Sequence, residues 1–478
     1  MLLKSKILPF WLFTVSAIVI LIISQLIQDG SFMDGMLYIC VSKNLAMGNG
    51  TFWNLNFSQT YLTSFNEQPP LYFGLLALFY KVLGTSMYVE RLFCFACFAA
   101  NAFFIHKLWK KIYSSNPLIA SHSWLPILFW TTIPVCFWAY INHVEETVMS
   151  VFTIASVYFI YSALFLNQKI IRNIILGGLF IFLASLTKGI QGLFPIVAIG
   201  AYWLVVRDMS FKKMVMYSLL LMSVPTGLYL ILVLTNHDVY DSYQRYFETR
   251  LVRTFNNVGS TTGNRFELLF ILVQELLPIV TVSSLILFFT KKHKAVDVED
   301  SNHNKTIIWF LLIGLAGALP LMVTLEQRGF YLVTTMPFFA ISIAMWVAPR
   351  LTKLINKIPI EHKGFKIAKI TTLLLLLISI VFSILQIGKF KRDEGLLKDI
   401  YAIGTIVPHP SIINMPEDMV NDWSIVCYFE RYLDISLESE NKHTYFIIRK
   451  DLPKVLVPAN YKLYPIQTTD LDLYKLSE

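Results

Sequence analysis

Long apolar runs separated by short polar loops occupy the chain up to residue 388. Eleven of these runs are about 17–23 residues long, enough to cross a hydrocarbon core of roughly 30 Å as a helix. They lie near 8–27, 88–108, 123–140, 147–166, 171–187, 190–206, 214–234, 268–290, 306–325, 329–348 and 366–388. A shorter apolar run at 69–84 carries Lys81 and predicts a short helix at one interface. The pattern predicts an all-α polytopic membrane protein with about 11–13 transmembrane helices.

Two other regions differ from this membrane body. The segment 28–87 is expected to form a large first loop with juxtamembrane helices, one of which begins near Asp34. The tail 389–478 alternates short β-rich runs with Pro and Asn turns, which predicts a small α/β domain. We therefore expect a membrane domain over 1–388 and an extracytoplasmic domain over 389–478.

Composition and charge support this interpretation. The chain is 55% hydrophobic and 15% charged, whereas a soluble domain carries roughly 25% charged residues. This excludes a soluble enzyme, a disordered chain and a disulfide scaffold. With the N-terminus placed in the cytoplasm, 20 of the 40 Lys and Arg residues fall in cytoplasmic loops and 9 on the outer side of the membrane body. The positive-inside rule thus predicts a cytoplasmic N-terminus and an extracytoplasmic C-terminus, and the net charge of +9 does not indicate a nucleic-acid partner.

The ionisable residues that topology does not explain lie on the predicted outer side. Asp34 is either a first-turn acid favoured by the helix dipole or a general base close to the membrane. Glu145 and Glu146 follow His143 at the start of a span and are either capping acids or catalytic carboxylates. Glu67 and Gln68 precede two prolines and are expected to face the same outer pocket, together with His143.

Several cations accompany these acids. Lys188 lies in a turn between two predicted spans, where it either snorkels or binds an anion. The loop 235–266 contains Arg250 and Arg253, which fit either an interfacial helix that contacts head groups or a phosphate-binding wall. Arg328 and Tyr331 lie at the mouth of a later span. Cys40 and Cys427 are both expected outside, and a disulfide between them is left open.

No phosphate-binding glycine loop, HExxH motif or Ser/His/Asp arrangement accompanies these residues. A carboxylate that activates a hydroxyl, together with cations that hold a phosphate leaving group, is the minimum for transfer from a lipid-phosphate donor. These residues therefore predict a site for group transfer at the outer surface of the membrane.

The order of six segments resembles the GT-C superfamily of integral-membrane glycosyltransferases, in its aminoarabinose-transferase and protein O-mannosyltransferase-like branch. The resemblance spans residues 28–348. The segments are DGMLYICVSKNLAMGNG from Asp34, NEQPPLYF, HVEETVMSVF, LASLTKGIQGLFPIV, YFETRLVRTF and EQRGFYLVTTMPFFA. It implies a GT-C fold and transfer of a sugar from a polyprenyl-phosphate donor.

The resemblance also implies roles for individual residues. Asp34 matches the catalytic base, and Glu146 or Glu145 matches the second acidic position. The positions that match donor-phosphate contacts are Lys188, Arg253, Arg328 and Tyr331, with Arg250 as a substitute for the lysine that the aminoarabinose transferases have at Gln68. Those enzymes also place a histidine near Arg250 that can bind a divalent metal together with the glutamate at Glu67. That histidine is absent here, so no metal ligand and no certain cofactor is assigned, and a divalent metal at the extracytoplasmic pocket is left open.

We therefore expect a glycosyltransferase that moves a sugar from a polyprenyl phosphate to a hydroxyl on a lipid, a glycan or a protein, with inversion, at the extracytoplasmic face of a bacterial inner membrane. The alternatives are a flippase or transporter of lipid-linked sugars and a non-enzymatic envelope assembly protein. A transporter needs ionisable groups deep within the spans, where Glu275 stands nearly alone.

Overall fold

The computed structural model describes residues 6–248, 266–291, 296, 302–324 and 327–477. The chain divides into two compact units. Unit 1 contains 1–25, 94–141 and 145–386, and unit 2 contains 26–93, 142–144 and 387–478. The C-terminal segment thus groups with the first loop, and the division expected at residue 388 stays a prediction.

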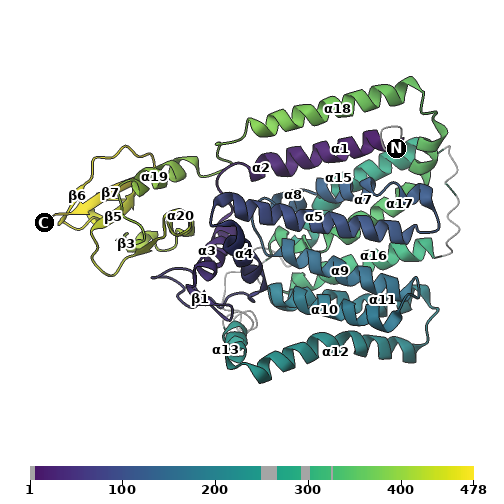
Figure 1. The fold of residues 1–478 in the computed structure, drawn as a ribbon, viewed down its shortest axis with the longest axis horizontal. Coiled ribbons are helices and arrows are strands. Elements are labelled where there is room, and N and C mark those ends of the chain that lie inside the picture. The colour runs from purple at the N-terminus through teal and green to yellow at the C-terminus, as the bar shows by residue number, and fades with distance from the viewer. Residues whose placement is uncertain (1–5, 249–265, 292–295, 297–301, 325–326, 478) are drawn as a thin grey trace. The chain divides into compact units, whose positions relative to one another are not determined.

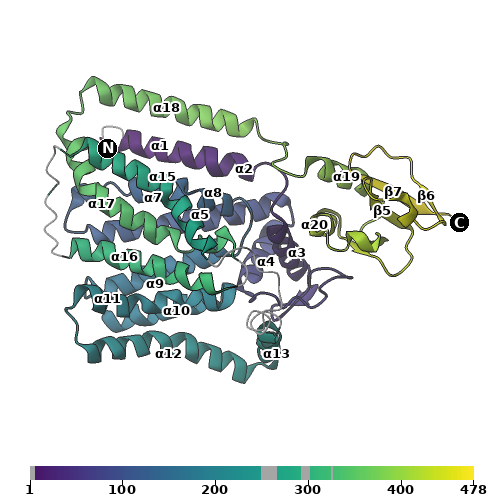
Figure 2. The same cartoon turned by 180° about the vertical axis from the view of Figure 1, so that it is seen from behind.

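Unit 1 is a bundle of long apolar helices whose axes run roughly in one direction (Figure 1); the view from behind in Figure 2 agrees. Within the described residues, nine helical stretches are long and apolar enough to cross a membrane. They are Leu8–Leu26, Met87–Ile112 (α5), Glu146–Leu164 (α9), Ile170–Val206, Phe211–Thr235 (α12), Glu267–Phe289 (α15), His303–Val323, Met336–Lys357 (α17) and Lys363–Ile384 (α18). The expected multi-pass membrane fold is confirmed.

Two of the expected spans follow each other directly, without a loop between their helical segments. Helix α10 (Ile170–Lys188) is followed by the 3-10 helix Gly189–Val197 and by α11 (Ala198–Val206). A Cβ atom on Gly192 would overlap the backbone of Ala184, so the chain reverses direction after Lys188. The ranges 171–187 and 190–206 are therefore two passes joined by a tight turn.

The expected span at 123–140 is broken in the middle, which corrects that prediction. It forms α7 (Trp124–Thr132) and the short α8 (Pro134–Ala139), separated by Ile133 in an extended conformation. Proline disfavours a helical conformation in the residue before it, which explains the break. The N–H of Val135 instead donates to Glu275 Oε2 at 2.6 Å, because an apolar environment leaves no water to satisfy it.

Small residues allow the central helices of unit 1 to approach closely. A Cβ on Gly177 of α10 would lie 2.9 Å from Ile160 of α9, and one on Gly178 would lie 2.7 Å from Val224 of α12. Ser156 of α9 donates its hydroxyl to the Gly177 carbonyl at 2.9 Å. Close backbone approach with interhelical hydrogen bonds is how helices associate in an apolar environment.

Unit 2 begins with the first loop. It contains α3 (Met33–Met47), a two-stranded hairpin of β1 (Gly50–Thr51) and β2 (Asn54–Leu55), and α4 (Leu71–Leu83). The short helices expected near Asp34 and at 69–84 are both present. Buried aromatic rings hold them together, with Tyr38 of α3 in edge contact with Tyr72 and Phe73 of α4.

The rest of unit 2 is a small α/β fold, as the turn pattern of the tail predicts. Five strands lie in the order β4-β3-β5-β7-β6, with β3 parallel to β4 and β5 and with β7 antiparallel to β5 and β6. The strands are β3 (Ser411–Asn414), β4 (Ile435–Glu438), β5 (Tyr445–Arg449), β6 (Tyr461–Leu463) and β7 (Leu471–Leu476). Helices α19 (Glu394–Gly404) and α20 (Trp423–Leu433) complete it. Cys40 and Cys427 are buried free thiols.

Candidate active site

Asp34 lies in the first turn of α3, in unit 2. The helix begins after Phe32, which has an extended conformation, and Asp34 is the acidic residue of its first turn. The side chain is partly exposed, unlike most of the residues that follow it in the helix. A carboxylate at a helix N-terminus is stabilised in its charged form, which suits both interpretations given above.

The segment Asn142–Val144 holds the start of this helix. Asn142 Oδ1 accepts the Phe32 N–H at 3.2 Å, and Tyr72 donates its hydroxyl to the His143 carbonyl at 2.8 Å. A Cβ on Gly35 would overlap the Asn142 carbonyl, so only glycine fits directly after Asp34. These contacts bring His143 next to the first turn of α3, and its place in an outer pocket with Glu67 and Gln68 stays a prediction.

His143 is buried and neutral. Its ring Nδ1 lies 3.0 Å from Ser31 Oγ, and its backbone has a φ of 60°, which is uncommon for a residue other than glycine. Burial lowers the pKa of His143 well below its usual value, and the positive charges of Lys391, Arg91 and Arg431 lower it further. The imidazole thus carries no charge near neutral pH.

In unit 1, four of the predicted site residues come together at the end of α10. Lys188 Nζ lies 2.6 Å from Glu146 Oε1 and 3.5 Å from Glu145 Oε2. Both glutamates are 0% exposed and Lys188 is 6% exposed. The same ammonium group lies 5.3 Å from the ring centroid of Tyr331. We refer to Glu145, Glu146, Lys188 and Tyr331 as the Lys188 group.

The turn after Lys188 depends on glycine. Gly189 has a φ of 65°, and a Cβ there would overlap the hydroxyl of Tyr246, the last residue of α13 (His237–Tyr246). The ammonium of Lys188 also lies 5.8 Å from the ring of Phe330, which stacks on Trp138. Carboxylates and aromatic rings therefore hold one cation at a fixed place.

The remaining predicted residues are placed less closely. Glu67 and Gln68 lie half-buried in the bend before α4, and Arg328 is exposed directly before the 3-10 helix Gly329–Leu332. Arg250 and Arg253 lie outside the described residues.

The described residues do not fit a metal ion. Across the ranges given above, no three His, Cys, Asp or Glu side chains gather closely enough to hold one. In the Lys188 group, an ammonium already occupies the place between the two carboxylates. We derive no step through a metal.

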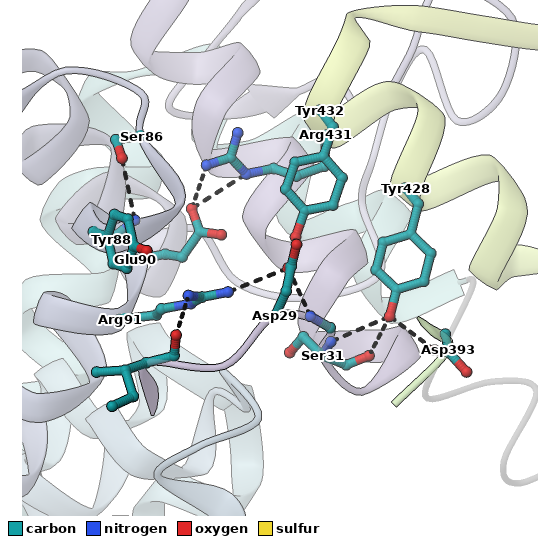
Figure 3. A network of polar contacts seen from close by, with 12 residues as sticks. Asp29, Ser31, Ser86, Tyr88, Glu90, Arg91, Asp393, Tyr428, Arg431 and Tyr432 are labelled. Atoms are coloured by element: carbon teal, nitrogen blue, oxygen red, sulfur yellow. Dashed lines mark hydrogen bonds and ion pairs between the residues drawn. The ribbon is translucent and has the colours of Figure 1, made fainter. Parts of the chain in front are cut away.

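A polar network in unit 2 contains residues that were not assigned to the predicted site (Figure 3). Arg431 of α20 contacts Glu90 Oε2 with Nη2 at 2.5 Å and Nε at 3.2 Å. Burial disfavours the Arg431 cation, but Glu90 and the Tyr80 hydroxyl outweigh it and raise its pKa. The feature of the sequence that could have indicated this network is the pair of adjacent charged residues at the mouth of a span, Glu90 and Arg91.

Asp29 is the second centre of this network. Asp29 Oδ1 accepts from Arg91 Nη2 at 3.2 Å and from the Tyr432 hydroxyl at 2.6 Å, while Oδ2 accepts from the Tyr401 hydroxyl at 2.5 Å. The backbone of Asp29 also pairs with Lys389 and Lys391. The buried Asp29 carboxylate of the first loop thus accepts hydrogen bonds from two tyrosines of the C-terminal segment.

Comparisons with known proteins agree with this fold. A protein-family model described as dolichyl-phosphate-mannose-protein mannosyltransferase matches residues 67–236. The structure of ArnT from Cupriavidus metallidurans bound to undecaprenyl phosphate superposes with a TM-score of 0.69 at 11% identity, covering 97% of both chains. The apo form of that protein gives 0.67 at 13% identity, again over 97% of both chains. A search of curated proteins by sequence finds no match.

The Archaeoglobus fulgidus oligosaccharyltransferase in its apo form is more distantly similar, with a TM-score of 0.50 and 11% identity over 91% of this chain and 64% of that one. At these identities the likeness concerns the fold. It confirms the fold that the resemblance predicts, since the chain has an ArnT-like GT-C fold, and residues 67–236 are in addition similar to the protein mannosyltransferase family.

Proposed function

We propose that this protein is a membrane glycosyltransferase that moves a sugar from a polyprenyl-phosphate donor to a hydroxyl acceptor at the extracytoplasmic face. The observation that carries the proposal is the buried Lys188 group, which the matched segment 67–236 contains in part, in a fold similar to that of ArnT bound to undecaprenyl phosphate. A cation fixed beside aromatic rings and carboxylates suits a phosphate leaving group next to the membrane.

The chemistry is a single displacement. Asp34 removes the proton from the acceptor hydroxyl as its oxygen attacks the anomeric carbon. The bond between that carbon and the phosphate oxygen breaks, and polyprenyl phosphate leaves with the electron pair. Attack from the side opposite the leaving group inverts the anomeric configuration.

The leaving phosphate needs positive charge. Lys188 is the first candidate, and Glu146 and Glu145 hold its ammonium in place. The ring of Tyr331 lies beside this ammonium. Arg328, Arg250 and Arg253 are further candidates for the phosphate. Should Asp34 not be the base, Glu146 and Glu145 are the next carboxylates to test.

The transporter alternative loses its main residue in this fold. Glu275, the ionisable residue nearly alone within the predicted spans, caps the N-terminus of α8 through the Val135 N–H. This contact gives Glu275 a structural reason for its position, so it is not an indication of a transport path.

The test is release of polyprenyl phosphate by purified protein that is supplied with a panel of polyprenyl-phosphate sugars and an extract of surface acceptors. Asp34→Asn should lower turnover by roughly 10²- to 10⁴-fold, the usual contribution of a general base. Asp418→Asn, at an exposed acid in the C-terminal segment, is the matched control and should behave as wild type. Equal turnover of Asp34→Asn and wild type would remove Asp34 as the base.

A further inference from the structure

Helix α20 of the C-terminal segment packs along α3 with matching spacing. On α3 the contacting side chains are three and four residues apart, so they share one face of the helix. The contacts are Cys40 Sγ to Cys427 O at 3.3 Å, Lys43 Nζ to Arg431 O at 2.9 Å and to Asp434 Oδ1 at 2.7 Å, and Asn44 Nδ2 to Glu430 Oε1 at 3.4 Å. The second half of the helix that carries Asp34 is therefore held by α20 and by Asp434, which follows α20.

Tyr428 extends this contact to the residues just before α3 (Figure 3). Its hydroxyl oxygen lies 3.1 Å from the Ser31 carbonyl and 2.8 Å from Asp393 Oδ2, and it accepts the Ser31 N–H at 3.2 Å. One hydroxyl thus contacts both backbone groups of Ser31. Burial raises the pKa of Tyr428, so the hydroxyl keeps its proton.

Ser31 connects Tyr428 to His143 and to the start of α3. Ser31 Oγ lies 3.0 Å from His143 Nδ1, and Asp34 follows Ser31 by three residues, in the first turn of α3. Asn142, next to His143, accepts the N–H of Phe32. Ser31 and Phe32, the two residues before α3, are therefore both held by hydrogen bonds.

The Tyr428 ring is itself held rigidly. It stacks on Tyr432 at a centroid distance of 6.0 Å and an interplanar angle of 14°, and the Tyr432 hydroxyl bonds to Asp29, two residues before Ser31. The two tyrosines of α20 thus hold the same short turn from two points.

We propose that Tyr428 is a positioning residue for Asp34, which makes the C-terminal segment a working part of the catalytic apparatus. The inference rests on the proposed function, in which Asp34 is the base. A base acts only when it lies within hydrogen-bond reach of the proton that it removes. Without the Tyr428 hydroxyl, Ser31, three residues before Asp34, loses its hydrogen bonds to α20, while the Tyr432 contact with Asp29 and the contacts farther along α3 remain.

The experiment compares Tyr428→Phe with Tyr461→Phe in the full-length protein. Tyr461 is a buried tyrosine of the same C-terminal sheet whose hydroxyl also makes two contacts, with Asn414 Oδ1 and the His443 carbonyl. Two readouts are taken: kcat and KM for release of polyprenyl phosphate from the donor that wild type uses, and hydrogen–deuterium exchange of the peptide covering residues 30–36.

We expect Tyr428→Phe to lower kcat about 10- to 100-fold with KM for the donor unchanged, since a misplacement of about 1 Å has effects of this size. Exchange at 30–36 should rise. Tyr461→Phe should leave kcat and this exchange at wild-type values. Wild-type exchange at 30–36 in Tyr428→Phe, or a kcat equal to that of Tyr461→Phe, would overturn the inference.

Failure of the proposed function is seen separately. If wild type transfers no sugar, or if Asp34→Asn is as active as wild type, the proposed function fails whatever Tyr428→Phe does. The exchange measurement then still decides whether Tyr428 holds the turn before α3.

Discussion

Arg431 of α20 and Glu90 of α5 form a buried ion pair, although the two residues are 341 positions apart in the chain. The two side chains are 4% and 2% exposed, and the guanidinium contacts one carboxylate oxygen through two nitrogens. Arg431 also donates to the Thr85 carbonyl at 2.9 Å. Both charges are removed from water, so each side chain needs the opposite charge of the other to remain ionised in the folded protein.

Removing one partner of this pair should be strongly destabilising. Arg431→Met leaves the Glu90 carboxylate buried without its cation, and breaking a buried pair in this way costs about 3–5 kcal/mol. Heat denaturation of the purified protein measures the loss. The double variant Glu90→Gln/Arg431→Met should lose less than the sum of the single variants, because no uncompensated charge is left. Additive losses would contradict a direct coupling.

The matched control is Arg449→Met. Arg449 pairs with Asp422 and Asp451 on the exposed side of the C-terminal segment. Exposed pairs contribute little to stability, so the melting temperature should hardly change.

Gly35→Ala should disrupt the start of α3. The added methyl group would overlap the Asn142 carbonyl, and overpacking of this kind costs typically about 1–3 kcal/mol. We expect a lower melting temperature and a larger loss of sugar transfer, because Asp34 is the preceding residue. Gly227→Ala in α12 is the control, since no atom lies within 4 Å of the new methyl group. If Gly35→Ala transferred sugar at the wild-type rate, the first turn of α3 would have to accommodate the added methyl group, and the prediction would be wrong.

Lys188→Met should reduce transfer and stability together. Loss of the cation removes stabilisation of the leaving phosphate, an effect of about 10²- to 10³-fold in kcat for one electrostatic contact. It also leaves Glu145 and Glu146 buried without their ammonium partner. Adding Glu146→Gln should restore part of the melting temperature but none of the activity. Recovery of activity in the double variant would mean that Lys188 serves only to neutralise the glutamates.

Stability should fall in mild acid because of His143. Its pKa is lowered in the folded protein, so the unfolded chain takes up a proton more readily. The stabilisation is complete above the ordinary histidine pKa of about 6.5 and is lost as the pH falls below it. Melting temperatures between about pH 8 and pH 5 should decline for wild type and decline less for His143→Gln. His237→Gln, at a largely exposed histidine, should follow wild type.

Much of the fold follows from the sequence because the membrane restricts the choices. A backbone in an apolar environment has to satisfy its own hydrogen bonds, so apolar runs of about 20 residues become helices almost regardless of context. The single helix expected at 123–140 was wrong because Pro134 interrupts it, and Glu275, far along the chain, accepts the N–H of Val135.

The candidate residues were also visible in the sequence, since an ionisable group beside a span is costly and needs a reason. Their partners were not visible. The sequence indicated Lys188 as a phosphate contact and Glu145 and Glu146 as acids, and only the fold shows that they contact one another.

By itself, then, the sequence determined which segments are apolar helices, that α3 starts beside Asp34, and that the tail forms a small α/β fold. Those features depend on composition and on spacing within about 20 residues. The tertiary structure decided that α20 holds α3, that Arg431 pairs with Glu90, and that Tyr428 contacts Ser31. Contacts between distant segments depend on how whole helices pack, and no local pattern in the chain encodes that packing.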